Sequence, residues 1–188
     1  MIRNLCRASC VLVLSLILVL HAQSQSHLKA LRAGSATPAG QEFFCVGPYS
    51  IQECKTQVGG LQAVLQTYDS EKLGKWSWIL VRSQDWKQLT SQLHLNASSP
   101  AFSQLEYRQT FLDEALIVLE PKRELELLTK WSIPFDQLLA FAVSHELGHA
   151  FCNEPDESKA ERFGERLRKH LASECGSKKK HNLLAEVR

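Results

Sequence analysis

Two histidines and a glutamate in the stretch His145-Glu146-Leu147-Gly148-His149 are the side chains in this sequence best suited to chemistry. On a helix, residues four apart lie on one face, so the two imidazoles can share a metal ion while Glu146 lies beside them. Two such ligands and a third protein ligand leave one position of a Zn²⁺ ion for water, whose pKa the metal lowers towards neutrality. The spacing therefore predicts a zinc site in which Glu146 takes a proton from water.

The residues before this motif predict the helix that carries it. From Phe135 to Val143 every residue except Asp136 and Gln137 is apolar, which indicates a mostly buried helix over 135–152. Burying two histidines and a glutamate there without partners would be costly, which favours a metal site. The alternative is a pair of hydrogen-bonded core histidines without a metal.

The third zinc ligand is expected on the following helix, predicted over 155–171. A short turn between Asn153 and Glu154 would make the two helices antiparallel and bring the start of the second opposite the histidines. At 100° per residue, Glu157 points more nearly towards the motif helix than Glu161 does. We therefore assign Glu157 as the ligand, with Glu161 accepting the N–H of His145 and fixing its tautomer.

Two alternatives remain open for these glutamates. Glu161 could be the ligand, with the helix register shifted by one turn. Both could instead be solvent-exposed charges paired with Lys159 or Arg162, as surface carboxylates commonly are.

The N-terminal sequence indicates an exported protein of one domain. The chain has 188 residues, enough for a single domain with a real core. Residues 1–24 combine the basic Arg3 and Arg7, an apolar run over 11–20 and small residues before a cleavage point after Ser24, as in a signal peptide. The alternative is an uncleaved anchor, but the apolar run is shorter than the roughly 20 residues of a membrane span. We expect no stable membrane span after cleavage.

Charge and cysteine usage in the mature chain narrow the function classes further. Removing the signal takes two of the 22 basic residues and leaves as many as the 20 acidic ones, so nothing suggests a nucleic-acid partner. Four cysteines remain, Cys45, Cys54, Cys152 and Cys175, which predicts two disulfides in an exported protein. A continuous helix over 155–171 would be about 25 Å long, so we expect no bond between Cys152 and Cys175. The remaining choices are Cys45–Cys54 with two free thiols, or crossed pairs from the N-terminal segment to the last two helices.

The pattern along the chain predicts an α+β fold. Residues 25–41 are expected to be a flexible lead-in, 42–175 the folded domain and 176–188 a basic tail. Apolar periodicity and turn residues predict helices over 50–68, 85–93 with Ser83 as its cap, 121–131, 135–152 and 155–171, and strands over 76–81, 101–107 and 109–119, the last most strand-like at 115–119.

The motif and the segment after it resemble a known family. His-Glu-Leu-Gly-His followed by Glu157-Ser158-Lys159-Ala160-Glu161-Arg162-Phe163 is similar to the Glu-zincin metallopeptidases, and most similar to the compact ImmA/IrrE-type zinc peptidases. The resemblance implies a minimal zincin-like domain, with a small, mostly antiparallel sheet packed on the motif helix and the C-terminal helix. It also implies that the edge strand, here 101–107, runs above the motif helix and binds the substrate as an added strand.

Three features depart from the family pattern. Glu161 stands where Asp or Asn is usual, and the chain is exported whereas such peptidases are largely cytosolic. No tyrosine or histidine is obviously placed to polarise a substrate carbonyl; Tyr107 is a candidate, and His170 lies too far along the last helix.

The expected function is therefore a secreted or periplasmic zinc metallopeptidase with Glu146 as general base, acting on a peptide or protein substrate. We expect an endopeptidase rather than an exopeptidase. The alternative is an exported zincin-like domain that binds zinc and a protein partner without efficient turnover. The oligomeric state is not predicted.

Overall fold

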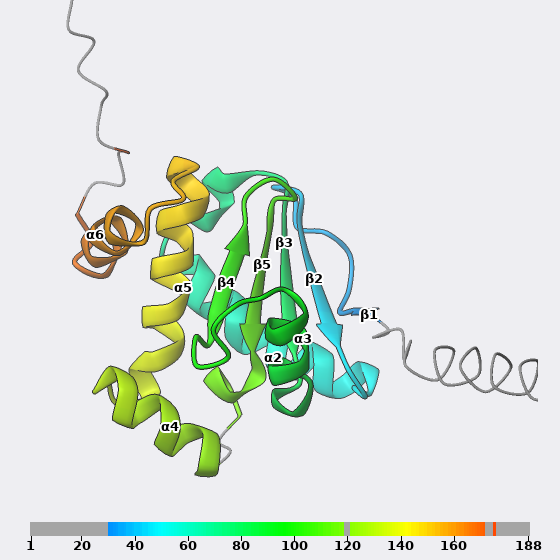
Figure 1. Cartoon of the computed structure of the whole chain (residues 1–188). Coiled ribbons are helices and arrows are strands. Elements are labelled where there is room, and N and C mark those ends of the chain that lie inside the picture. Colours follow the sequence, from blue (N-terminus) through cyan, green and yellow to red (C-terminus); the bar gives the residue numbers. More distant parts are fainter. Residues whose placement is uncertain (1–29, 119–120, 172–174, 176–188) are drawn as a thin grey trace, which may run out of the picture.

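The computed structural model describes residues 30–118, 121–171 and Cys175, and this part of the chain is an α+β domain. Its five strands form one mixed sheet in the order β1-β2-β3-β5-β4 (Figure 1), with β1 Ala30–Arg32, β2 Gln41–Val46, β3 Trp76–Val81, β4 Ala101–Gln104 and β5 Gln109–Asp113. The three central strands are parallel, and only the two outer pairs, β1 with β2 and β4 with β5, are antiparallel. The expectation of a mostly antiparallel sheet is therefore wrong, because helices connect the central strands as crossovers.

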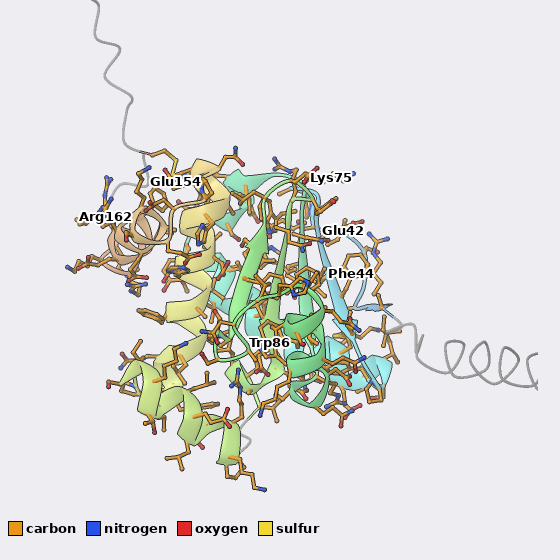
Figure 2. All side chains as sticks on the ribbon, in the orientation of Figure 1. Glu42, Phe44, Lys75, Trp86, Glu154 and Arg162 are labelled. Carbon is orange, nitrogen blue, oxygen red and sulfur yellow. A yellow bond between two sulfur atoms is a disulfide. The ribbon has the colours of Figure 1, made fainter. Side chains whose placement is uncertain are left out.

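Helices cover both faces of this sheet. Figure 1 shows α3 (Ser83–Gln92) in front of the sheet and α2 (Ile51–Gln66) behind it, while α5 (Phe135–Cys152) runs beside β4. The α3 face is a small core around Trp86, labelled in Figure 2, which packs with Val46, Ile79 and Val81. The other face carries the main core, where alternate strand residues such as Trp78 and Leu80 are fully buried. Successive side chains of a strand point to opposite faces of the sheet, so each strand contributes residues to both cores.

Several elements lie where the sequence predicted them. The strand over 76–81, the helix over 121–131 (α4, Pro121–Trp131) and the motif helix over 135–152 are confirmed. The first helix is α2, which Ser50 and Glu53 begin with a reciprocal capping box. The predicted helix over 85–93 is α3, but Ser83 does not cap it, since its hydroxyl donates to Asp113.

Three segments of the sheet differ from the prediction. The strand predicted over 101–107 ends at Gln104, as β4. The lead-in expected over 25–41 contains β1, which pairs with β2, a strand that the sequence did not predict. The strand predicted at 115–119 is wrong: Asp113 ends β5 and caps a 3-10 turn over Glu114–Leu116. A short apolar run is compatible with either a buried helical turn or a buried strand, so the run over 115–119 did not distinguish the two.

The last two helices form a tight antiparallel hairpin. Asn153 ends α5 in the left-handed conformation, and Asp156 caps α6 (Glu157–Arg168) by accepting from the Lys159 N–H. Glycines allow the close contact: a Cβ at Gly148 would overlap the carbonyl oxygen of Ala160, and one at Gly164 would lie 2.8 Å from that of Ser144. This hairpin places α6 directly against the motif.

Both disulfides are formed, and one corrects a prediction. Cys45–Cys54, one of the open choices, joins β2 to α2. Cys152–Cys175 is also present, with Cα atoms 5.4 Å apart, contrary to our expectation. The reason is that α6 ends at Arg168, earlier than the predicted 171, and His170 adopts a left-handed φ of 52° that turns the chain.

The predicted signal peptide over 1–24 and the basic tail over 176–188 lie outside the described residues. Among the described helices, none has the length and apolarity that a membrane span requires.

Candidate metal centre

The packing of α5 determines which of its side chains face the site. Leu138, Val143 and Leu147 are almost completely buried in the main core. Their burial fixes the rotation of the helix, so that the histidines and Glu146 face the space between β4 and α6. His149 and Glu146 are themselves only 6% and 4% exposed.

Helix α6 brings both predicted glutamates to His145. Glu157 Oε2 lies 3.0 Å from Nε2 of His145 and 3.5 Å from Nε2 of His149. Glu161 Oε2 lies 2.9 Å from Nδ1 of His145. The structure therefore places Glu157 with both imidazoles, and Glu161 behind one of them, in the arrangement that the helix periodicity predicted.

The outer nitrogens of the two rings have partners that fix their tautomers. Nδ1 of His149 lies 2.6 Å from the carbonyl oxygen of Glu154, and Nδ1 of His145 faces the carboxylate of Glu161. Both partners only accept hydrogen bonds, so each Nδ1 carries a hydrogen and, in the neutral ring, each Nε2 presents a lone pair. The two Nε2 atoms lie 3.2 Å apart. Three acceptor atoms, two nitrogens and the oxygen of Glu157, thus converge on one point.

This convergence fits a divalent cation. The donor atoms of His145, His149 and Glu157 all lie within 4.8 Å of one another, and their closest separations are 3.0, 3.2 and 3.5 Å. Tetrahedral zinc with arms of 2.0–2.1 Å separates its ligand atoms by about 3.3 Å. Two nitrogens and one carboxylate oxygen are also a donor set that zinc accepts.

The charged groups around His145 also favour a bound cation. Burial, the largest single effect, would lower the pKa of this ring, but the hydrogen bond to Glu161 and the charges of Glu146 and Glu157 together raise it. The site therefore carries surplus negative charge, which a bound cation would neutralise.

Arg168 holds Glu161 in place. Its guanidinium forms an ion pair with Glu161, donates to Ser144 Oγ at 2.7 Å and lies 4.4 Å from the ring centre of Phe141. Lys159, one of the two cations named as alternative partners of these glutamates, pairs with Glu154. Glu161 is therefore part of a hydrogen-bond network that runs from His145 through Glu161 and Arg168 to Ser144.

Glu146 points into the same space from the other side of His145. Ser103 Oγ, on β4, donates to its Oε2 at 2.6 Å. Burial raises the pKa of Glu146, while the Ser103 hydrogen bond and the neighbouring histidines act in the opposite direction. A buried carboxyl beside a candidate metal site is a candidate general base.

A groove of about 740 Å³ passes these residues. Its lining follows β4 along its length, from Leu93, Leu95, Asn96 and Ser99 before the strand to Leu105 after it, and includes Lys130, Pro155, both histidines, Glu146 and Glu157. A smaller apolar pocket of about 80 Å³ opens beside His145 and is lined by Pro100, Ala101, Leu138, Phe141 and Ala142.

The candidates for carbonyl polarisation are not at the site. Tyr107 is 66% exposed in the turn between β4 and β5 and does not line the groove, and His170 lies beyond the end of α6. Sequence reasoning missed Ser103 and Arg168. Both residues lie far from the motif along the chain, and no local sequence pattern indicates a contact over such a separation.

Comparisons with known proteins identify no relative. No protein-family model matches this sequence, no curated protein matches it significantly, and no solved structure significantly matches the fold.

Proposed function

We propose that this protein is an exported zinc-dependent peptidase of the Glu-zincin type, in which His145, His149 and Glu157 hold the metal and Glu146 is the general base. The observation that carries the proposal is the convergence of three acceptor atoms at zinc-like separations beside a buried carboxylate. The two disulfides fit an oxidising compartment, which agrees with a secreted or periplasmic protein.

Each residue then has a distinct chemical role. Zinc, when bound, polarises the substrate carbonyl and lowers the pKa of its water. Glu146 accepts the proton of the attacking water and returns it to the leaving amine. Glu161 and the Glu154 carbonyl keep both Nε2 atoms available by holding the hydrogens on Nδ1.

The substrate proposed is an extended peptide bound along β4. This strand is the edge of the sheet nearest the motif helix, as the family resemblance implied. Asp113 N–H donates to the Pro100 carbonyl, so in an antiparallel pair the backbone groups of Ala101 and Ser103 face away from β5. The Ala101 carbonyl accepts from Ser99, which leaves the Ala101 N–H and the Ser103 backbone for an added strand.

The shape of the groove favours an internal stretch of peptide. Its lining extends past the metal site on both sides along β4, so a chain can continue in both directions, as an endopeptidase requires. The pocket formed by Leu138, Phe141 and Ala142 suits an apolar side chain next to the cleaved bond.

The test combines metal analysis with cleavage. The purified mature chain, loaded with zinc, is incubated with a proteome-derived peptide library, and cleaved bonds are identified by mass spectrometry. We expect one zinc per chain, and cleavage next to apolar residues that disappears in Glu146→Gln while the zinc content stays the same. This variant also controls for contaminating peptidases.

Two results would oppose the proposal in different ways. Substoichiometric zinc would remove the metal site itself. Stoichiometric zinc without cleavage of any peptide would favour the alternative, an exported zinc-binding module that recognises a protein partner without turnover.

A further inference from the structure

A line of hydrogen bonds crosses the sheet and ends on Glu146. Trp76 Nε1 on β3 donates to Thr110 Oγ1 on β5 at 3.0 Å, and Thr110 Oγ1 lies 2.8 Å from Ser103 Oγ on β4. Ser103 Oγ lies 2.6 Å from Glu146 Oε2 on α5. The line therefore connects two central strands, the edge strand and the motif helix.

The chemistry of the groups gives this line one direction. Ser103 Oγ donates its only hydrogen to Oε2 of Glu146. Thr110 must then be the donor to Ser103, and the indole of Trp76, which can only donate, supplies Thr110. Each hydroxyl accepts one hydrogen bond and donates one, so reversing any bond would leave a buried donor without an acceptor.

The line is buried and rigid at its inner end. Thr110 is completely buried and Trp76 is 2% exposed, and both lie on strands within the sheet. If the Ser103 hydroxyl rotated away from Glu146, its hydrogen would point at Thr110. The Thr110 hydroxyl would then have no acceptor for its own hydrogen, and the surrounding apolar core offers no water to replace it.

We propose that Ser103, Thr110 and Trp76 are positioning residues that hold one oxygen of Glu146, Oε2, and so direct the other, Oε1, towards the water that is deprotonated. This inference rests on the proposed function. It goes beyond the Glu-zincin resemblance, which was drawn from the motif and the helix after it. Ser103 would thereby couple the strand that binds the substrate to the group that reacts with it.

The first arm of the test uses turnover. One hydrogen bond to a charged group corresponds to about 10- to 100-fold, so Ser103→Ala should lower kcat by that factor with KM and zinc content unchanged. Ser103→Thr keeps the hydroxyl and should restore most of kcat. Thr110→Val should lower kcat less, and adding it to Ser103→Ala should have no further effect, because the bonds act in series.

A matched control separates positioning from burial. Thr90 is as completely buried as Thr110, but its hydroxyl donates within α3 on the opposite face of the sheet. Thr90→Val should leave kcat unchanged. Wild-type kcat in Ser103→Ala, no recovery in Ser103→Thr, or an equal loss in Thr90→Val would each overturn the inference.

The second arm does not depend on catalysis. In chelator-treated protein, Ser103→Ala is combined with Glu146→Ala in a double-mutant cycle of melting temperatures. The loss caused by Ser103→Ala should be larger when Glu146 is present, by on the order of 5 °C. Equal losses would show that the bond is absent and overturn the inference. Clear coupling in a protein that cleaves nothing would retain the hydrogen-bond line and reject the peptidase.

Discussion

Glu157 and Glu161 are one helical turn apart on α6, yet they face different nitrogens of the same imidazole. Glu157 is also within 3.5 Å of His149, and its side chain is 79% exposed at the groove, whereas Glu161 is held between His145 and Arg168. The first glutamate can follow a metal ion and the second cannot, because its other oxygen is already paired. Replacing each of the two glutamates should therefore affect zinc binding differently.

Alanine variants of these two glutamates should differ in how they bind zinc. Glu157→Ala should lose most of its zinc, since it removes a ligand. Glu161→Ala should keep zinc with roughly 10- to 100-fold weaker affinity or activity, as the loss of an outer partner typically costs. Zinc content by elemental analysis and a competition titration with a chromogenic chelator measure the two effects.

Glu165 provides the control for this pair. It lies on the same helix, is paired with Lys169 and contacts no site residue, so Glu165→Ala should bind zinc like the wild type. If Glu161→Ala loses zinc and Glu157→Ala keeps it, then Glu161 is the ligand and α6 is shifted by one turn.

The placement of these side chains could be predicted because their positions depend on local rules. Two histidines four apart on a helix and a turn at Asn153 are enough to bring Glu157 and Glu161 to His145. Ser103 could not be found in this way. Its contact with Glu146 depends on the register of β4 against β5 and on the distance of α5 from the sheet, and neither is encoded in a short pattern.

At the scale of elements, the α5–α6 hairpin brings together the residues of the candidate metal site. Gly148 is the fourth residue of the motif, and its backbone touches the backbone of Ala160. Any side chain at this position would move α6 outward and take Glu157 and Glu161 away from the histidines.

Gly148→Ala should therefore lower both stability and zinc affinity. Overpacking at a backbone contact costs about 1–3 kcal/mol, and the free energy of unfolding measured in urea should fall by at least that amount. The control is Gly59→Ala in α2, where a Cβ meets nothing within 4 Å, so the same substitution should stabilise the protein by about 0.5–1 kcal/mol. Equal effects in the two variants would contradict the contact.

The Cys152–Cys175 disulfide closes the same hairpin. It joins residues separated by 23 positions, and a loop of this length contributes about 3 kcal/mol by restricting the unfolded chain. The double variant Cys152→Ser/Cys175→Ser should lose that stability and bind zinc more weakly, because α6 is no longer held at both ends.

The other disulfide serves as the comparison. Cys45 and Cys54 are completely buried between β2 and α2, away from the metal ligands, so replacing both with alanine should reduce stability without changing the zinc affinity of the folded protein. If zinc affinity falls equally in both double variants, the Cys152–Cys175 bond has no special role at the site.

Element types were easier to predict than element ends and pairings. The strand Trp76–Val81 carries aromatic residues on one face and β-branched residues on the other, which predicts a buried strand without further information. The end of α6 depends instead on the turn at His170 and on the Leu171 N–H bonding back to the Arg166 carbonyl. That turn made Cys152–Cys175 possible, and the predicted longer helix had excluded it.

At the scale of the whole molecule, the candidate site joins two layers. β4 and α5 belong to the sheet and the main core, while α6 packs outside α5 (Figure 1). Helix α6 is held there by Phe163 and Leu167, which are buried in the main core. The glycine contacts, the disulfide and the ion pair of Arg168 add to this packing. A cation shared by His145, His149 and Glu157 would join α5 to α6 at this point.

Metal removal should therefore lower the melting temperature of the whole domain. Zinc binds only the folded arrangement, so free zinc at several hundred times its dissociation constant stabilises the folded state by about 3–4 kcal/mol. For a domain of this length, that corresponds to a fall of roughly 10 °C after chelation, measured by differential scanning calorimetry. Added zinc should restore the original melting temperature. The Glu157→Ala protein should melt at the same temperature with and without chelator, since it lacks a ligand. A wild-type protein whose melting is equally indifferent to chelator would show that His145, His149 and Glu157 form only a hydrogen-bonded cluster.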